Sequence, residues 1–311
     1  MKALVTGGAG FIGRWVVKKL LEEKDKVWVL DDLSNGDEGN LSEFTANENY
    51  QGLIEGDVAD IKCVTKLFQN KYDICIHAAA QINVQESLDN PDKAFRTNLI
   101  GTYNILSCAL KTDTKVVLIG TCMVYDMAKA GAISELWPVK PSSPYAGSKL
   151  AAENLALSYY YGYGLPVVVL RPFNTYGPFQ KANMEGGVVS IFIKNQIDGE
   201  VLKVFGDGTQ TRDLLYVEDC ADFIVRGAFS GKAVGQIINA GAGRDISIND
   251  LALLISRDSG KIQHVEHHHP QSEIQKLLCD SSKARELLGW EPRTTLEEGI
   301  GKTEQWLRAR Y

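Results

Sequence analysis

The chain has 311 residues, of which 44% are hydrophobic and 23% are charged, and its formal net charge is -6. This composition is typical of globular proteins, and the length can bury one large core or two smaller ones. Because the sequence has no block of like charges and no apolar run of about 18 residues, it indicates neither a nucleic-acid-binding surface nor a membrane span.

The first residues predict a unit that binds a dinucleotide. An apolar run at 2–6 is expected to form a buried strand, a helical pattern follows at 15–21, and a second apolar run at 27–30 ends at Asp31-Asp32. The turn between the first strand and the helix reads Gly7-Gly8-Ala9-Gly10-Phe11-Ile12-Gly13. These glycines let backbone amides approach a pyrophosphate at the helix N-terminus. Asp31 would bind the adenosine ribose hydroxyls and repel the extra phosphate of NADP, so the sequence predicts NAD.

The alternation of strands and helices continues toward the middle of the chain. A strand at 51–58 contains Asp57 and Val58, and Asp57 would either bind the adenine amino group or close a turn. A strand at 72–77 leads into Ala78 and Ala79, which are small enough for the backbone to pass close to the cofactor. After a helix at 91–110, a strand at 115–120 delivers Thr121 at its carboxyl end, where open parallel sheets bind ligands.

A helical segment at 143–155 carries the pair that we expect to perform acid–base chemistry. Tyr145 and Lys149 are four residues apart, so they project from the same face of the helix. A nearby ammonium group favours the phenolate, which predicts a lowered pKa for Tyr145 and a role as a base toward a substrate hydroxyl. Two exposed helix residues would give the same spacing.

The pattern changes after a sixth strand at 166–170. A helix is expected at 188–198, short strands at 202–205 and 213–217, and helices at 248–257, 281–288 and 296–308. We therefore predict a Rossmann-type, doubly wound parallel α/β sheet with a smaller C-terminal α/β lobe. The NAD-binding part would comprise 1–172 and about 213–239, and the lobe about 173–212 and 240–311.

Motifs along the whole chain resemble those of the extended short-chain dehydrogenase/reductases, in the branch of nucleotide-sugar epimerases and dehydratases. Besides the glycine turn, Asp31, Asp57-Val58, Asn98 and Tyr145-x-x-x-Lys149, they are His77-Ala78-Ala79-Ala80, Arg171-Pro172-Phe173-Asn174-Thr175-Tyr176-Gly177-Pro178, Gly206-Asp207-Gly208-x-x-x-Arg212-Asp213 and Leu288-Gly289-Trp290-Glu291-Pro292. The resemblance implies an NAD-dependent enzyme that oxidises a sugar carbon, usually C4, and later returns the hydride.

The resemblance also implies a role for each site residue. Tyr145 would deprotonate the sugar hydroxyl, Lys149 would bind the nicotinamide ribose, and Thr121 would bond the same hydroxyl. Asn174 and Arg212 would bind the diphosphate of a UDP- or dTDP-sugar. The residues assigned to the cofactor are Gly7, Gly10, Phe11, Ile12, Gly13, Asp31, Asp32, Asn35, Asp57, Val58, Ala78, Ala79, Asn98, Tyr145 and Lys149. Relatives dimerise through helices equivalent to 91–110 and 144–163, which predicts a homodimer.

Cys122 and Met123 follow Thr121 where the 4,6-dehydratases of this family carry Asp and Glu. Because methionine has no titratable proton, this difference favours a 4-epimerase of a UDP-hexose or UDP-N-acetylhexosamine, with Met123 against the sugar. Cys122 is either a packing residue or a catalytic thiol, and a 4,6- (or 5,6-) dehydratase that uses this thiol is the alternative. A non-catalytic NAD-binding sensor is a third possibility, which the complete set of Thr121, Tyr145 and Lys149 disfavours.

Three further expectations concern the histidines, the cysteines and the N-terminus. The sequence His267-His268-His269 stands near the place where relatives carry an arginine for the diphosphate. Adjacent residues in an extended segment point away from each other, so we predict no metal site there. The six cysteines lie far apart and the glycine turn begins at Gly7, which predicts reduced thiols in a cytoplasmic protein without a signal peptide.

Overall fold

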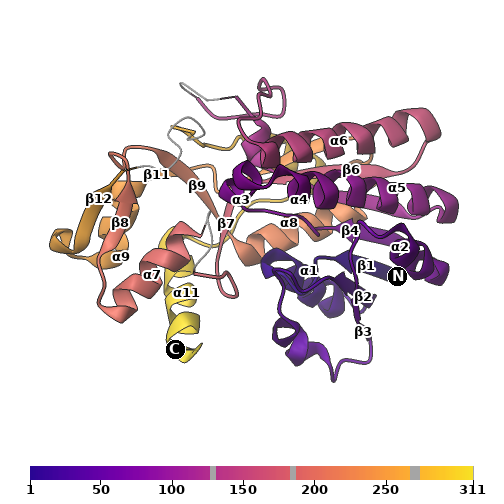
Figure 1. Cartoon of the computed structure of the whole chain (residues 1–311), viewed down its shortest axis with the longest axis horizontal. Coiled ribbons are helices and arrows are strands. Elements are labelled where there is room, and N and C mark those ends of the chain that lie inside the picture. The colour runs from indigo at the N-terminus through magenta and orange to yellow at the C-terminus, as the bar shows by residue number, and fades with distance from the viewer. Residues whose placement is uncertain (127–130, 183–186, 267–273, 311) are drawn as a thin grey trace.

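The computed structural model describes residues 1–126, 131–182, 187–266 and 274–310, and its largest element is a seven-stranded sheet (Figure 1). Every strand pair in this sheet is parallel. In spatial order the strands are β10 (Ile237–Ala240), β6 (Val167–Pro172), β5 (Lys115–Ile119), β4 (Ile74–His77), β1 (Lys2–Thr6), β2 (Lys26–Asp31) and β3 (Tyr50–Glu55). Helices cover both faces, which confirms the predicted Rossmann-type fold.

Two hydrophobic cores lie on the two faces of the sheet. On one face the sheet packs against α1 (Phe11–Glu22), α8 (Val217–Phe229) and α10 (Ser282–Leu288). The other face is covered by α2 (Ile61–Leu67), α5 (Gly101–Thr112) and α6 (Pro144–Tyr163). Because each central strand is buried on both faces, its sequence is a continuous apolar run.

The helix that we expected at 91–110 is interrupted. It consists of α4 (Pro91–Phe95), a π-helical turn η3 (Arg96–Ile100) and α5, and the short helix α3 (Val84–Asp89) precedes it. Asn98 lies inside the π-helical turn, and such turns are frequent at functional sites. The remaining short turns are η1 (Glu38–Phe44), η2 (Phe68–Asn70), η4 (Cys122–Val124) and η5 (Ser259–Lys261).

The second part of the molecule lies beside the carboxyl ends of the central strands (Figure 1). Its strands are β7 (Asn174–Tyr176), β9 (Thr211–Tyr216) and β11 (Asp245–Ser247) in one sheet, and β8 (Leu202–Phe205) and β12 (Ile262–Val265) in another. Helices α7 (Val188–Asp198), α9 (Ile248–Ser256) and α11 (Leu296–Arg310) enclose its core.

The structure departs from the expected division of the chain in two places. We expected about 213–239 to belong to the NAD-binding part, but residues 213–216 belong to β9 in the second part. We expected 240–311 to belong wholly to the smaller lobe, but Ala284 and Trp290 pack into the core of the central sheet. The Trp290 indole donates a hydrogen bond to the carbonyl of Asp219 at 3.1 Å, which fixes this segment against α8. No helix in the described ranges is long and apolar enough to cross a membrane.

Candidate active site

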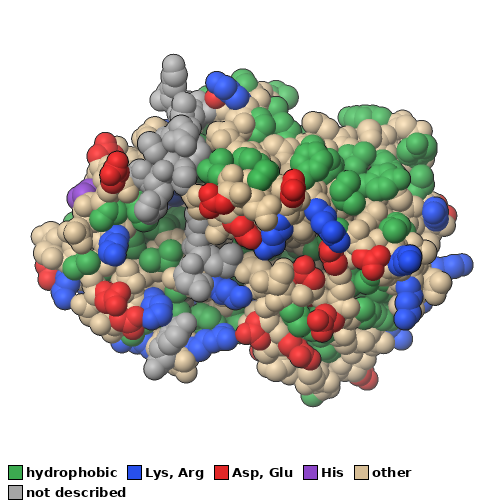
Figure 2. Space-filling view, viewed as in Figure 1, with side chains coloured by type: hydrophobic (Ala, Val, Ile, Leu, Met, Phe, Trp, Pro, Cys, Tyr) green, Lys and Arg blue, Asp and Glu red, His purple; other side chains and the backbone are tan. Residues whose placement is uncertain are grey.

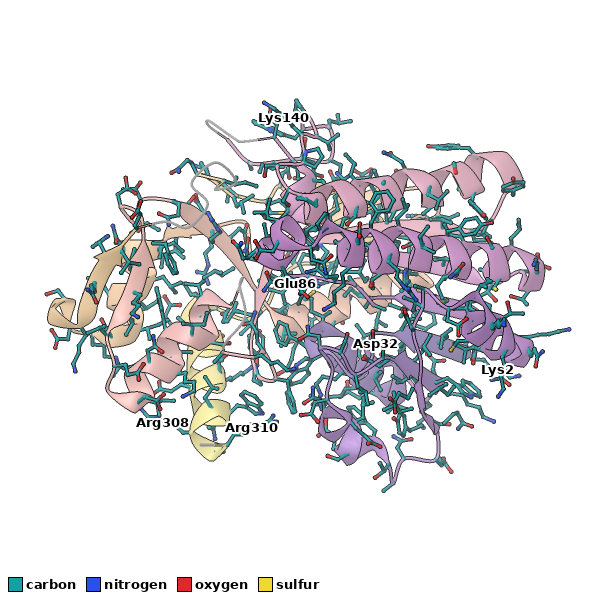
Figure 3. The ribbon with its side chains drawn as sticks, in the orientation of Figure 1. Lys2, Asp32, Glu86, Lys140, Arg308 and Arg310 are labelled. Atoms are coloured by element: carbon teal, nitrogen blue, oxygen red, sulfur yellow. The ribbon has the colours of Figure 1, made fainter. Side chains whose placement is uncertain are left out.

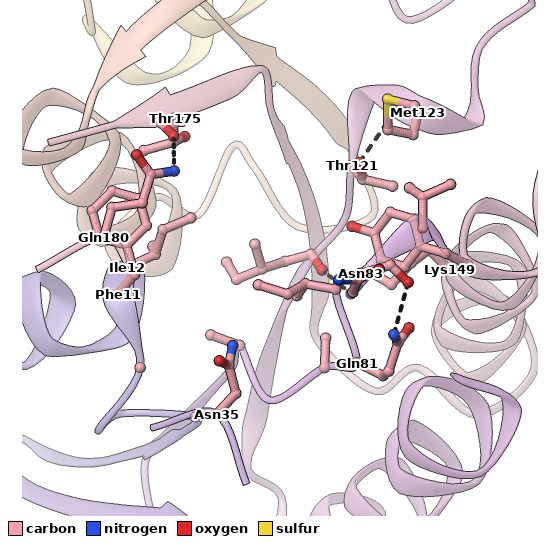
Figure 4. A pocket seen from close by; sticks show the side chains of 18 of the residues that line it. Phe11, Ile12, Asn35, Gln81, Asn83, Thr121, Met123, Lys149, Thr175 and Gln180 are labelled. Atoms are coloured by element: carbon pink, nitrogen blue, oxygen red, sulfur yellow. Dashed lines mark hydrogen bonds between the residues drawn. The ribbon is translucent and has the colours of Figure 1, made fainter. Parts of the chain in front are cut away.

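A cavity of about 910 Å³ lies where the carboxyl ends of the central strands face the second part of the molecule (Figure 4). The residues after β1, β2, β4, β5 and β6 all contribute to its wall. Ligands bind at this edge of open parallel sheets. Figure 3 shows Glu86 close to the junction of the two parts and Asp32 on the side of β2. The cavity thus extends from the glycine turn to the second part of the molecule.

The glycine turn after β1 is packed so tightly that Gly7 and Gly13 leave no space for a side chain. Gly7 has a φ of +70°, and a Cβ there would lie 2.6 Å from the backbone nitrogen of Ala79. A Cβ on Gly13 would lie 2.0 Å from the carbonyl oxygen of Gly7. Gly10 caps α1 without a side-chain hydrogen bond, so the first amides of the helix stay available to an anion. Gly7, Gly10, Phe11, Ile12 and Gly13 all line the cavity.

Asp31 ends β2 with its carboxylate held in place. One oxygen accepts a hydrogen bond from the amide of Ala9 at 2.9 Å, and the other accepts one from the amide of Leu33 at 3.0 Å. Burial raises the pKa of Asp31, and these two amides oppose the shift. Each carboxylate oxygen has a second lone pair, so Asp31 can still accept a hydrogen bond from a ribose hydroxyl. Asp32 and Asn35 line the same part of the cavity.

Two of the residues that we assigned to the cofactor do not line the cavity. The carboxylate of Asp57 accepts a hydrogen bond from the amide of Ala59 at 2.7 Å and pairs with Arg96 at 3.4 Å, so it closes a turn, while its neighbour Val58 does line the cavity. Asn98 is buried behind the wall. Its side chain bonds both backbone groups of Gln81, at 2.8 and 3.0 Å, and donates to Ser148 Oγ at 2.9 Å.

The structure brings Thr121, Tyr145 and Lys149 together at the cavity (Figure 4). Thr121 follows β5, and Tyr145 and Lys149 lie in the first turns of α6, whose N-terminus is capped by Ser143. The Thr121 hydroxyl is near enough to the Tyr145 phenol to act on its pKa. The Lys149 ammonium donates a hydrogen bond of 2.6 Å to the carbonyl of Ile119. Burial lowers the pKa of Lys149 to about 8.

The predicted direction of the Tyr145 pKa is wrong for this structure. Burial raises the pKa of Tyr145 to about 12, and the nearby Thr121 hydroxyl only partly opposes this shift. The prediction relied on the charge of Lys149, but that ammonium bonds the carbonyl of Ile119. Tyr145 is therefore a phenol near neutral pH, and a further positive charge or a hydrogen-bond donor is needed to make it a base.

Cys122 and Met123 form the turn after Thr121, and both line the cavity. Cys122 packs into a small apolar cluster with Phe173, Leu277 and Cys279. Burial raises the pKa of its thiol to about 12. The thiol is thus protonated near neutral pH and can donate a proton, but it cannot accept one. The backbone amide of Met123 donates to Thr121 Oγ1 at 3.2 Å.

Asn174 and Arg212 line the cavity on the side of the second part of the molecule. Arg212 Nη1 donates to the carbonyls of Thr211 and Ile274, each at 2.8 Å, which holds the guanidinium in place. Asn174 Oδ1 is buried without a hydrogen-bond partner in the described part of the chain, so it has capacity for a donor.

The sequence analysis missed several polar residues of the wall. Gln81 precedes α3 and Glu86 lies in it, and we did not predict this helix. Lys93 comes from α4 and Lys203 from β8. Gln81 donates to Glu86 at 3.2 Å, and Lys93 pairs with Glu86 at 2.6 Å. An available signal was Asn83, which caps α3 by accepting from the amide of Glu86.

Of the histidines named in the sequence analysis, the structure describes His77. His77 is buried between Thr6 and Thr102, with its ring nitrogens 2.7 and 3.1 Å from their hydroxyl oxygens, and it does not line the cavity. The residues His267, His268 and His269 lie outside the described residues. Within the described ranges no group of three His, Cys, Asp or Glu side chains is arranged to hold a metal ion.

Comparison with known sequences places this site in a family. The sequence pattern of the NAD dependent epimerase/dehydratase family matches residues 3–241. The chain belongs to this family. NAD is the cofactor of the family. The site fits such a dinucleotide, because Gly7 and Gly13 exclude side chains and the N-terminus of α1 is open. Asp31 also has spare lone pairs for a ribose hydroxyl.

The relatives of this chain carry the names of different enzymes. A UDP-glucose 4-epimerase from Mycolicibacterium smegmatis is 36% identical over 99% of both chains. The crystal structure of Pal from Bacillus thuringiensis is 59% identical, with a TM-score of 0.98 over 100% of both chains. The dTDP-glucose 4,6-dehydratase DesIV from Streptomyces venezuelae, solved with NAD bound, is 30% identical, with a TM-score of 0.93 over 99% of this chain and 97% of DesIV. The similar proteins thus include both an epimerase and a dehydratase.

Proposed function

We propose that this protein is an NAD-dependent nucleotide-sugar 4-epimerase that acts on a UDP-hexose or a UDP-N-acetylhexosamine. The observation that carries the proposal is the composition of the wall around Thr121. Tyr145 and Lys149 supply the groups for an oxidation, whereas Cys122 is a protonated thiol and Met123 does not titrate. Neither residue can remove a proton from the carbon next to a ketone, so the simplest fate of a 4-keto sugar here is reduction from its other face.

The first step needs a proton acceptor for the C4 hydroxyl of the sugar. Tyr145 takes this proton while Thr121 holds the same hydroxyl, because both side chains face the same cavity. NAD, when bound, supplies a cationic nicotinamide ring that accepts the hydride from C4. That positive charge also lowers the pKa of a neighbouring phenol, which offsets the effect of burial on Tyr145. Lys149 binds the adjoining ribose through its ammonium.

The second step returns the hydride to the opposite face of C4, and the Tyr145 phenol returns its proton to the oxygen. The sugar must turn over while its nucleotide stays bound. Arg212 and Asn174 are suited to hold the diphosphate, because a fixed guanidinium can bond two phosphate oxygens and the side-chain NH2 group of Asn174 can donate to another.

Incubation with nucleotide sugars in deuterated water tests this proposal. NAD-loaded protein is mixed with UDP-glucose, UDP-galactose, their N-acetyl forms and dTDP-glucose, and the products are followed by NMR. We expect interconversion of a C4 pair without solvent deuterium in the sugar, and we expect Tyr145→Phe to keep its NAD but to lose this activity. A 4-keto-6-deoxy product would contradict the proposal.

The second candidate is a 4,6- (or 5,6-) dehydratase that uses Cys122. One observation favours it, since the buried neutral thiol beside Thr121 can protonate the departing C6 hydroxyl, after which its thiolate can take the proton from C5. This reaction places solvent deuterium at C5, whereas the epimerase reaction does not. If no nucleotide sugar is converted at all, the protein is instead an NAD-binding sensor.

We further propose that the protein is a cytoplasmic homodimer in which residues 1–172 and about 213–239 bind NAD. Figure 2 shows hydrophobic side chains gathered over α5 and α6. Phe95, Ile100 and Tyr103 are 54%, 42% and 48% exposed, which a partner subunit would reduce. All six cysteines are free, which fits a reducing compartment. Light scattering should give twice the chain mass, and Tyr103→Glu should lower it.

A further inference from the structure

A buried carboxylate lies directly behind the oxidation site. Glu153 is on α6, one turn beyond Lys149, and is only 1% exposed. It forms a two-pronged ion pair with Arg171 of β6, whose Nη2 and Nε donate to Glu153 Oε2 at 2.6 and 3.0 Å. A pair of charges this deeply buried is costly to desolvate, so stability alone gives little reason for it.

The same carboxylate reaches the backbone of the Thr121 turn. Burial raises the pKa of Glu153, and the nearby backbone amide of Thr121 is one of the groups that oppose this shift. The preceding residue, Gly120, leaves space for this contact, because a Cβ there would lie 2.3 Å from Glu153 Oε1 and 3.0 Å from Arg171 Cγ. One side chain of α6 is thereby connected to the end of β5 and to β6.

We infer that Glu153 is a positioning residue that fixes Thr121 relative to Tyr145 and Lys149 in the oxidation step. Thr121 comes from β5, whereas Tyr145 and Lys149 come from α6, so their relative placement depends on contacts between the two elements. Glu153 provides such a contact through the Thr121 amide, and Arg171 holds the carboxylate in the required orientation. The inference rests on the proposed function, because it assigns Tyr145 and Thr121 to the same reaction.

The negative charge of Glu153 also acts on the two titrating groups of the site. It raises the pKa of Tyr145 and opposes the lowering of the Lys149 pKa by burial. Arg171 on β6 acts on Glu153, and Cys122 on η4 acts on Tyr145. His77 on β4 interacts with Lys149, and Tyr125 lies beside Arg171. Because Tyr125 and Cys122 have pKa values raised to about 12 and His77 is neutral, Arg171 is the main opposing charge.

Paired variants separate the hydrogen bond from the charge. Glu153→Gln/Arg171→Met removes both charges and keeps an acceptor for the Thr121 amide. Glu153→Met/Arg171→Met removes both charges and the acceptor. Replacing both members of a buried ion pair avoids leaving one charge unpaired.

Glu153→Asp keeps the charge but is one methylene too short for the Thr121 amide. This variant replaces the methionine double variant in the comparison if the latter does not fold. Bound NAD and the thermal midpoint are measured for each variant.

The kinetic readout is the rate of NADH formation when NAD-loaded protein is mixed with UDP-glucose or UDP-N-acetylglucosamine. We expect the methionine double variant and Glu153→Asp to be slower than the glutamine double variant by about 10- to 100-fold, with KM and bound NAD unchanged. Equal rates for the glutamine and methionine double variants, both folded and NAD-loaded, would overturn the inference.

A second readout needs no substrate and therefore separates failure of the inference from failure of the proposed function. The pKa of Tyr145 in the NAD-loaded protein is measured from the NMR shift of ¹³C-labelled tyrosine, with Tyr145→Phe to assign the signal. We expect a lower pKa in the glutamine double variant and an unchanged pKa in Glu153→Asp. An unchanged pKa in the glutamine double variant would remove the electrostatic part of the inference. Absence of NADH in the wild type with every sugar would instead contradict the proposed function.

Discussion

Replacing Gly13 with alanine tests whether the close packing of the glycine turn is what allows NAD to bind. The added Cβ would lie 2.0 Å from the carbonyl oxygen of Gly7, about 1 Å closer than a carbon and an oxygen can approach without a bond. Gly7 cannot move away easily, because its own α-carbon faces the backbone of Ala79. The N-terminus of α1 must therefore shift outward, which removes its amides from the pyrophosphate. Such overpacking costs about 1–3 kcal/mol, and we expect NAD affinity to fall by about 10- to 100-fold.

Calorimetric titration of NAD into protein stripped of cofactor measures this loss, and the thermal midpoint without NAD measures the strain itself. Gly301→Ala in α11 is the matched control, since nothing lies within 4 Å of the position of its Cβ and an alanine there favours the helix. Gly301→Ala should keep full NAD affinity and a thermal midpoint at least equal to that of the wild type. If Gly13→Ala bound NAD as tightly as Gly301→Ala, the reasoning about close approach would be refuted.

Three further predictions concern single side chains. Cys122→Ala should change the kcat of an epimerase by less than about 3-fold, whereas a loss of about 100-fold or more would identify the thiol as a proton donor. Asp31→Asn should raise the affinity for NADP relative to NAD by at least about tenfold in competition binding, because the repelling carboxylate is removed. Burial lowers the pKa of His77 to about 3 from 6.5, so below about pH 6.5 the unfolded chain binds a proton that the folded chain does not. Stability is therefore lost as the pH falls, and the free energy of unfolding from urea titrations should drop about 2 kcal/mol more between about pH 7 and about pH 5 in the wild type than in His77→Gln.

The sequence allowed the central sheet to be predicted because its strands are buried on both faces. The runs at 116–119 and 167–170 are apolar throughout, and each leads toward the edge where ligands bind. The second part of the molecule was harder to predict. Its strand β7 has three residues, and α10 returns to the core of the first part through Trp290, a contact that spans 71 residues of the chain. Short elements and distant contacts leave little periodicity to detect.

The site was predictable where neighbours in sequence determine the geometry, and it was not predictable where distant residues do. Spacing alone placed Tyr145 and Lys149 on one face of a helix. The direction of the Tyr145 pKa depended on burial, and the ammonium of Lys149 bonds a carbonyl of β5 that lies 30 residues away. Asn98 likewise belongs to a recognisable motif, but its partners are Gln81 and Ser148, which place it behind the cavity wall.

The turn after β5 explains how one fold can perform different reactions after the same oxidation. Thr121 Oγ1 accepts its hydrogen bond from the backbone amide of Met123, and Glu153 Oε1 lies against the backbone of Gly120, the residue before Thr121. Neither contact uses the side chain of residue 122 or 123, so these side chains can change without moving Thr121. An acid and a base at these two positions would lead from the 4-keto sugar to elimination. A buried thiol and a thioether leave the 4-keto sugar without a base beside Thr121, and this difference is why we favour the epimerase over the dehydratase.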